Sequence, residues 1–131
     1  MKTLICTSCN IRNCMKASEG EDPEYCPAVT DSEEIKKSFE KYFKDPFTKK
    51  IALAAARVEG EGYGKWTRVK EAIEFAKKIE AKKIGIATCI GLLKEAQVLT
   101  GILKKNGFQV ESICCKAGKI DKAKIGLKEE E

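Results

Sequence analysis

The chain has 131 residues, of which 43% are hydrophobic and 34% are charged, and its net charge is +5. This length suits one ordinary domain, and no apolar run reaches the roughly 18 residues that a membrane-spanning helix needs. Seven cysteines and no histidine are present. The lack of histidine excludes Cys/His zinc fingers and Ser–His or Cys–His nucleophile pairs.

The odd number of cysteines prevents complete disulfide pairing, and clustered thiols in a reducing compartment serve more often as ligands or redox groups. The short apolar start runs straight into the first cysteines and does not fit a signal peptide, so we expect a cytoplasmic protein. Lysines concentrate in the second half but alternate with glutamates on predicted helix faces, as at Lys70 and Glu71. This pattern is typical of a solvated surface and does not favour nucleic-acid binding.

The first half of the chain predicts a loop region followed by helices. Residues 1–30 are interrupted by asparagine, glycine and proline, and we expect mostly loop around a metal. Asp31 and Ser32 then provide an N-cap for an amphipathic helix that ends near Asp45, before Pro46.

A second helix is predicted to begin at Pro46 and to end in the glycines at positions 60, 62 and 64, and a third helix follows Thr67. The segment 60–68 is interpreted as a connection in which Trp66 packs and Thr67 caps the next helix. The alternative is a flexible loop that covers a ligand, which we favour less.

The second half predicts a β-α-β unit. Residues 83–89 are a short, apolar, β-branched run typical of a buried strand, Gly91 opens a helix that reaches Lys105, and residues 108–114 predict a second strand. Such a unit implies parallel strands. The predicted fold class is therefore α/β: a helix-rich, two- or three-layer Rossmann-like β-α-β unit with an N-terminal cysteine metal knuckle.

We expect a cysteine-rich metal-binding module at 1–30 and a helical layer with the β-α-β unit at 31–131, together one compact domain. Two parallel strands are few for an independent sheet. Either residues 1–5 add a strand, or a second copy of the chain or a missing C-terminal segment completes the sheet. No membrane partner is expected.

The first four cysteines, Cys6, Cys9, Cys14 and Cys26, are spaced C-x2-C-x4-C-x11-C. Four thiolates are a full ligand set for one zinc ion or one [4Fe–4S] cluster. Only one C-x2-C pair is present, so the pattern is not that of a zinc ribbon. The frequent structural use of all-cysteine zinc sites favours zinc slightly, whereas the Cys26-Pro27 pair is a feature of iron–sulfur motifs. Disulfides and unliganded thiols are weaker alternatives.

A second set of cysteines follows the predicted strands. Cys89 ends the first strand, directly before Ile90 and Gly91, and Cys114 and Cys115 end the second. Parallel pairing brings them to one sheet edge, where ligands bind in open α/β sheets. Gly91 permits a ligand to approach the backbone.

We therefore interpret Cys89, Gly91, Cys114 and Cys115 as a candidate cofactor-binding site, with Cys89 as the candidate catalytic thiol. A redox site, a second metal site and a covalent catalyst all stay open. A further alternative is that Cys89 and Cys114 only fill the interior.

These residues indicate a metal-binding protein of unassigned biochemical role. A thiol- or iron–sulfur-dependent redox enzyme of anaerobic metabolism is the alternative, and a nucleic-acid-binding adaptor is a third. No pattern names a substrate, and the sequence leaves open whether the protein is an enzyme.

Four segments together resemble one family: the N-terminal cysteine cluster, residues 68–76 (RVKEAIEFA), residues 83–92 (KIGIATCIGL) and residues 114–116 (CCK). In them the chain is similar to uncharacterised, cysteine-rich, metal-binding proteins of anaerobic bacteria and archaea, a domain-of-unknown-function family. The resemblance covers nearly the whole chain and implies a cytoplasmic α/β protein. It implies metal ligands at Cys6, Cys9, Cys14 and Cys26, and a second site at Cys89, Cys114 and Cys115. Members of that family continue with further cysteine-bearing strands, which implies that this chain is a short member or a fragment.

Overall fold

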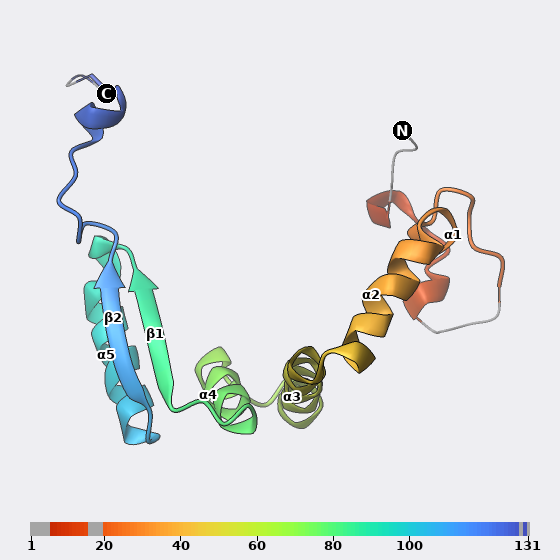
Figure 1. Ribbon diagram of the computed structural model, residues 1–131, viewed down its shortest axis with the longest axis horizontal. Coiled ribbons are helices and arrows are strands. Elements are labelled where there is room, and N and C mark those ends of the chain that lie inside the picture. Colours follow the sequence, from red (N-terminus) through yellow and green to blue (C-terminus); the bar gives the residue numbers. More distant parts are fainter. Residues whose placement is uncertain (1–5, 16–19, 129, 131) are drawn as a thin grey trace. The chain divides into compact units, whose positions relative to one another are not determined.

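The computed structural model describes residues 6–15, 20–128 and 130, and the chain divides into two compact units, Met1–Ala52 and Leu53–Glu131 (Figure 1). The two units meet at Ala52 and Leu53, whereas the sequence predicts a boundary between residues 30 and 31. The separate metal-binding module at residues 1–30 stays a prediction. The strand considered for residues 1–5 lies outside the described part of the chain.

The first unit begins with short turns. Two 3-10 turns, η1 (Cys6–Ser8) and η2 (Asn13–Met15), and a single-turn helix α1 (Pro27–Thr30) are joined by loops. Helix α2 (Ser32–Lys44) follows, with the bounds that the sequence predicts. Asp31 is its N-cap residue, but the Asp31 carboxylate accepts a hydrogen bond from the Thr30 hydroxyl at 2.6 Å and makes no capping bond to the helix.

The apolar side of α2 is exposed. The rings of Phe39 and Phe43 meet edge to face with centroids 5.1 Å apart, and they are 58% and 63% exposed. Among the residues that the structure describes up to Ala52, none is buried. The described part of the first unit therefore shows no hydrophobic core of the kind that stabilises a small domain.

Helix α3 (Pro46–Gly62) starts at the predicted proline. The Asp45 carboxylate accepts hydrogen bonds from the backbone N–H groups of Phe47 at 3.1 Å and Thr48 at 3.2 Å. Proline at the first helical position loses no hydrogen bond, because the N–H it lacks has no partner there. The start of α3 is thus determined by Asp45 and Pro46 together.

Thr67 starts α4 (Arg68–Lys78), and its hydroxyl accepts a hydrogen bond from the Lys70 N–H at 3.3 Å. Trp66 packs against Gly62, where an added Cβ would lie 2.5 Å from the ring atom Cε3. The Lys70 ammonium lies 4.7 Å from the centroid of the Trp66 ring. The predicted cap and ring packing in this connection are confirmed.

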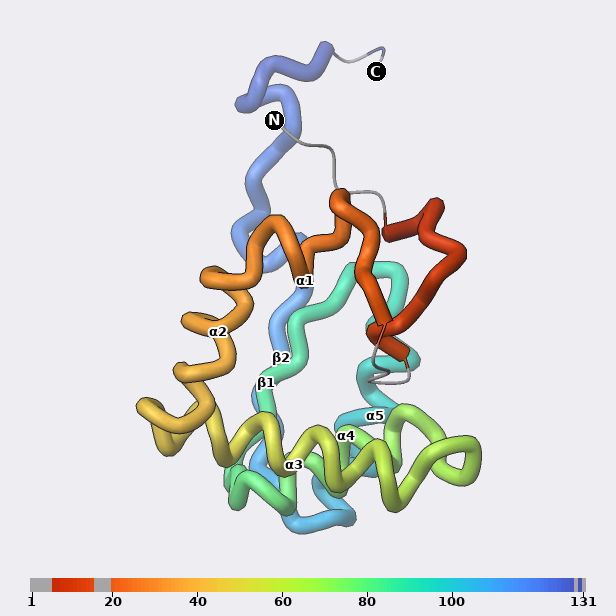
Figure 2. Tube along the Cα trace, turned by 90° about the vertical axis from the view of Figure 1, so that its right-hand side faces the viewer, coloured from red at the N-terminus to blue at the C-terminus, as the bar shows by residue number. Residues whose placement is uncertain are grey.

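The second unit contains the predicted β-α-β unit. Strands β1 (Lys83–Thr88) and β2 (Gln109–Cys114) pair in parallel, and α5 (Leu93–Lys105) connects them (Figure 1). Figure 2 shows α5 along one face of this sheet. A 3-10 turn, η3 (Ile90–Leu92), comes before α5, so the helix begins two residues later than the expected Gly91.

The buried core of the second unit joins α4, α5 and the sheet. Its members are Ile73, Ala76, Leu103 and Phe108, and Ile84, Ile86 and Val110 of the strands pack against them. Because side chains alternate along a strand, the next residues point to the opposite face of the sheet. Three residues on that face, Gly85, Ala87 and Ile113, are exposed.

The chain is a helix-rich α/β protein with a small parallel sheet, as predicted. The Rossmann-like layering stays a prediction. After β2 the chain forms one more 3-10 turn, η4 (Lys122–Ile125), capped by the Asp121 carboxylate. No helix in the described part of the chain combines the length and apolar composition that crossing a membrane requires.

Candidate functional site

The N-terminal cysteines begin with a tight turn. The Cys9 N–H donates a hydrogen bond to the Cys6 carbonyl at 3.2 Å, which closes the C-x2-C segment. The backbone N–H groups of Arg12 and then Ile11 hydrogen-bond to the Cys9 sulfur and hold the pKa of this thiol below its ordinary value. Donors aimed at sulfur favour the thiolate, which is the form that binds metals.

Tyr25 lies among three of these thiols. Its hydroxyl donates a hydrogen bond to Cys9 and also lowers the pKa of Cys9. The pKa of Tyr25 itself is raised, first by partial desolvation of its hydroxyl and then by the hydrogen bond to Cys9. The charges of three thiols add to this effect: Cys9, Cys26 and Cys6. Tyr25 therefore marks the region of the first unit in which Cys6, Cys9 and Cys26 act on one group.

The four sulfur atoms do not form a closed metal centre. Among the described residues, no three Cys, Asp or Glu side chains are grouped closely enough to hold a metal ion. All seven thiols are free of disulfides. The donor set suits zinc or an iron–sulfur cluster chemically, because it supplies four thiolates. The assignment of Cys6, Cys9, Cys14 and Cys26 as ligands stays a prediction.

The strand-end cysteines are placed by the register of the sheet. The last ladder pair is Thr88 with Cys114, and the Cys115 N–H donates to the Thr88 carbonyl at 2.9 Å. Cys89 and Cys115 follow this pair on the two strands, and their side chains hydrogen-bond to each other. Both are exposed. The structure therefore brings Cys89 and Cys115 together, as the sequence predicts for this edge.

Cys114 occupies a different environment. It is partly buried and lines a hollow of about 370 Å³ beside α5, together with Leu93, Ala96 and Thr100. Its neighbour in the sequence, Cys115, is on the opposite side of the strand because side chains alternate. The three thiols of this edge are thus a pair and a separate single thiol.

The surroundings of Cys115 favour its thiolate. The backbone N–H of Ile90 hydrogen-bonds to its sulfur and lowers the pKa of Cys115, and Cys89 and the charge of Lys116 lower it further. The sequence pattern favours Cys89 as the reactive thiol instead. The sequence nevertheless contains a signal for Cys115. Cys115 comes one residue after the end of β2, just as Cys89 comes one residue after the end of β1.

Gly91 lies in η3, next to this pair. A Cβ added at Gly91 would meet no atom within 4 Å. The backbone here is accessible from solvent, so a ligand can approach the edge. The contribution of Gly91 to ligand binding stays a prediction.

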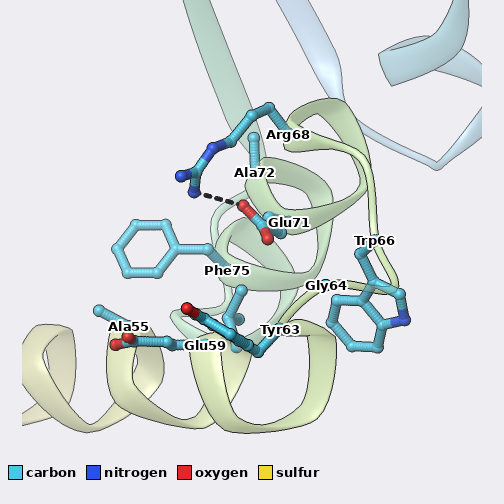
Figure 3. A pocket seen from close by; sticks show the side chains of 10 residues that line it. Ala55, Glu59, Tyr63, Gly64, Trp66, Arg68, Glu71, Ala72 and Phe75 are labelled. Atoms are coloured by element: carbon cyan, nitrogen blue, oxygen red, sulfur yellow. Dashed lines mark hydrogen bonds and ion pairs between the residues drawn. The ribbon is translucent and has the colours of Figure 1, made fainter.

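A hollow of about 640 Å³ lies between α3 and α4 (Figure 3). Tyr63 and Phe75 line it, as does an ion pair of 2.6 Å between the Arg68 guanidinium and the Glu71 carboxylate. Figure 3 shows this pair as a dashed line above the Phe75 ring. Each charged group already has a partner of opposite charge, so the ion pair gives no evidence for a bound ligand.

The fold and the thiols define a class: a cysteine-rich α/β protein with a pair of exposed thiols at the edge of a parallel sheet. Residues 26–131 match the family described as "Protein of unknown function (DUF1847)", and the chain belongs to this family. The matched region includes the pair Cys89 and Cys115.

The uncharacterized protein MJ0455 of Methanocaldococcus jannaschii is 43% identical to the chain over 119 residues. The alignment covers 91% of this chain and 55% of the relative, so the chain spans about half the length of that curated relative. No solved structure matches the chain. Membership of a family of unknown function is thus confirmed, while metal binding and a distribution among anaerobes stay predictions.

Proposed function

We propose that Cys6, Cys9, Cys14 and Cys26 bind one metal centre, zinc in the first place, and that the metal stabilises the first unit. The observation that carries this proposal is the absence of any buried residue among those described up to Ala52. Units of this size rarely fold on hydrophobic burial alone and need disulfides, a metal or a partner. Four cysteine thiols, none of them in a disulfide, are available in this unit as metal ligands.

The turn at Cys6 and Cys9 supports the same proposal. Both thiols belong to one short turn. The backbone N–H groups of Arg12 and Ile11 stabilise the thiolate of Cys9. Metal binding of this type is coupled to folding, so the ligands gather as the metal binds. Cys14 and Cys26 come from separate segments and would complete the ligand set.

Elemental analysis of protein purified without oxygen tests the proposal. We expect about one zinc ion per chain, as in structural sites with four cysteine ligands. A brown protein with iron and broad visible absorption would assign the alternative, a [4Fe–4S] cluster. Cys9→Ser should lose the metal, and Cys114→Ser, which changes a thiol outside the proposed set, should retain it. An unchanged metal content in Cys9→Ser would contradict the proposal.

Limited proteolysis gives an independent readout. Removal of the metal should expose residues 6–52 to cleavage, while the core of β1, α5 and β2 stays resistant, because that core does not contain the proposed ligands. Equal resistance of the first unit with and without metal would show that the metal is not its stabilising group.

We also infer that further strands extend the sheet of β1 and β2, supplied by additional residues of the kind that the longer relative contains. In the described part of the chain the sheet has two strands, so each strand has one edge of unpaired backbone groups with which a further strand can pair, and Ile113 on the open face is 61% exposed. The full relative should show slower hydrogen exchange in its segment equivalent to β1 than the present chain shows. A dimeric mass for the present chain, lost in Ile113→Asp, would instead assign the extra strands to a second copy.

A further inference from the structure

We propose that Cys115 and Cys89 form a thiol–disulfide exchange pair at the carboxyl edge of the sheet, with Cys115 as the attacking thiol and Cys89 as the resolving thiol. This activity is separate from the proposed metal site, which uses other cysteines. The substrates that fit are accessible disulfides, since both thiols are exposed.

The register of the sheet places the two residues side by side. The Cys115 N–H bond to the Thr88 carbonyl, 2.9 Å long, completes the last parallel pair, Thr88 with Cys114, so Cys89 and Cys115 are the next residues on the two neighbouring strands. Neighbouring strands are about 4.8 Å apart, which lies within the range of about 4.4–6.8 Å between the Cα atoms of a disulfide. The side chains of Cys89 and Cys115 are also in hydrogen-bonding contact. The spacing of the two strands is thus compatible with a disulfide between Cys89 and Cys115.

The surroundings of the pair distinguish the two roles. The Ile90 N–H donates a hydrogen bond to the Cys115 sulfur, and the Lys116 ammonium adds a positive charge nearby. Both favour the thiolate of Cys115, which is the nucleophile in disulfide exchange. Cys89 is the partner thiol in contact with that sulfur, so it is positioned to attack the mixed disulfide.

The reaction balances as a two-electron transfer. The Cys115 thiolate attacks one sulfur of a substrate disulfide, a bond forms to that sulfur, and the other half leaves as a thiolate that takes a proton from water. Deprotonated Cys89 then attacks the Cys115 sulfur and releases the second half in the same way. The substrate is reduced to two thiols and the protein is oxidised to the Cys89–Cys115 disulfide. A dithiol reductant restores the starting state.

Cys114 provides the matched control. It is adjacent to Cys115 in the sequence but lines the hollow beside α5, on the other face of the sheet. If proximity in the sequence decided reactivity, Cys114 and Cys115 would behave alike. If the register decides it, only Cys115 links to Cys89.

Oxidised glutathione is the probe for the test, applied to the metal-loaded full chain and followed by peptide mapping in a mass spectrometer. We expect a Cys89–Cys115 disulfide without a lasting glutathione adduct. Cys89→Ser should accumulate glutathione on Cys115. Cys115→Ser should react more slowly with oxidised glutathione, and Cys114→Ser should behave as the parent. Peptide mapping reports on each cysteine separately. If the metal proposal fails, glutathione adducts should appear on the four N-terminal cysteines, Cys6, Cys9, Cys14 and Cys26, and this result is distinct from the result at Cys89 and Cys115.

Two outcomes would overturn the proposal. One is a parent chain that forms only lasting adducts or a disulfide that involves Cys114, which needs no variant to observe. The other is full protection of Cys89 and Cys115 by one added equivalent of zinc beyond the N-terminal site, since this would assign the pair to a second metal site. A circular dichroism spectrum equal to that of the parent verifies the fold of each serine variant.

Discussion

The Cys115 N–H bonds to the Thr88 carbonyl at 2.9 Å, and this one contact places Cys115 level with Cys89 on the neighbouring strand. The contact belongs to the last pair of the sheet, Thr88 with Cys114, and Cys89 and Cys115 are the next residues on the two strands. The pairing of two exposed thiols is therefore a consequence of strand register and of the single residue by which each follows its strand.

We expect alkylation of Cys115 by iodoacetamide to have a pH midpoint below that of an ordinary cysteine. The pKa of Cys115 is lowered, first by the Ile90 N–H and then by Cys89 and Lys116, so its thiolate is present above that lowered pKa and is lost as the pH falls through it. Mass spectrometry of each cysteine across pH measures the midpoint. Lys116→Gln should raise it, while the control Lys119→Gln should not. A midpoint at or above that of a thiol in a free peptide would contradict the prediction.

Two glycines of α3 should respond in opposite ways to alanine. At Gly62 a Cβ would lie 2.5 Å from the Trp66 ring, so Gly62→Ala should cost about 1–3 kcal/mol of unfolding free energy. At Gly60 a Cβ meets nothing within 4 Å, so Gly60→Ala should stabilise by about 0.5–1 kcal/mol. Urea denaturation measures both changes. Equal effects of the two substitutions would mean that Trp66 does not pack against Gly62.

Loss of the cap at Thr67 should destabilise α4. The Thr67 hydroxyl accepts the Lys70 N–H, and replacing such a cap by alanine costs about 1 kcal/mol. Thr67→Ser retains the oxygen and serves as the control. Urea midpoints that are the same for the alanine and serine variants would show that the hydroxyl does not contribute.

Acid should loosen the start of α3. The pKa of Asp45 is lowered by its hydrogen bonds with the Thr48 hydroxyl and with the N–H groups of Phe47 and Thr48. Because the folded pKa lies below the unfolded one, this stabilisation is complete above the ordinary aspartate range and is lost as the pH falls through the folded pKa. Hydrogen exchange of the first turn of α3 reports the loss.

Asp45→Asn should weaken the same turn already at neutral pH. Asp31→Asn is the matched control, since the Asp31 side chain makes no capping bond to α2. A first turn of α3 that exchanges equally in Asp45→Asn and in the parent would refute the role of this carboxylate.

Local signals predicted the elements well. Pro46 and Thr67 start the helices that follow them, because a proline ring and a capping hydroxyl act within one turn of the chain. The predicted start of α5 was wrong by two residues, since the turn η3 uses Ile90 and Gly91 before the regular helix begins. The error arises because the pattern of hydrogen bonds at a helix end decides where the regular helix begins, and composition does not predict this pattern to within one or two residues.

The sites were less predictable than the elements. The spacing of Cys6, Cys9, Cys14 and Cys26 indicates a ligand set, but it does not determine where loops place the four sulfur atoms. At the sheet edge the sequence favoured Cys89, whereas the Ile90 N–H and Lys116 favour the thiolate of Cys115. These neighbours act through space, and their effect depends on the pairing of two strands.

By itself the sequence determined the α/β class, the order of helices and strands and the arrival of three cysteines at one edge, because periodicity, caps and strand composition act over a few residues. Only the tertiary structure decided which thiols meet. Cys89 and Cys115 lie on one face of the sheet, whereas Cys114 lies on the face that α5 covers. The reason is that the register between two strands, together with the alternation of side chains along each strand, decides which side chains meet.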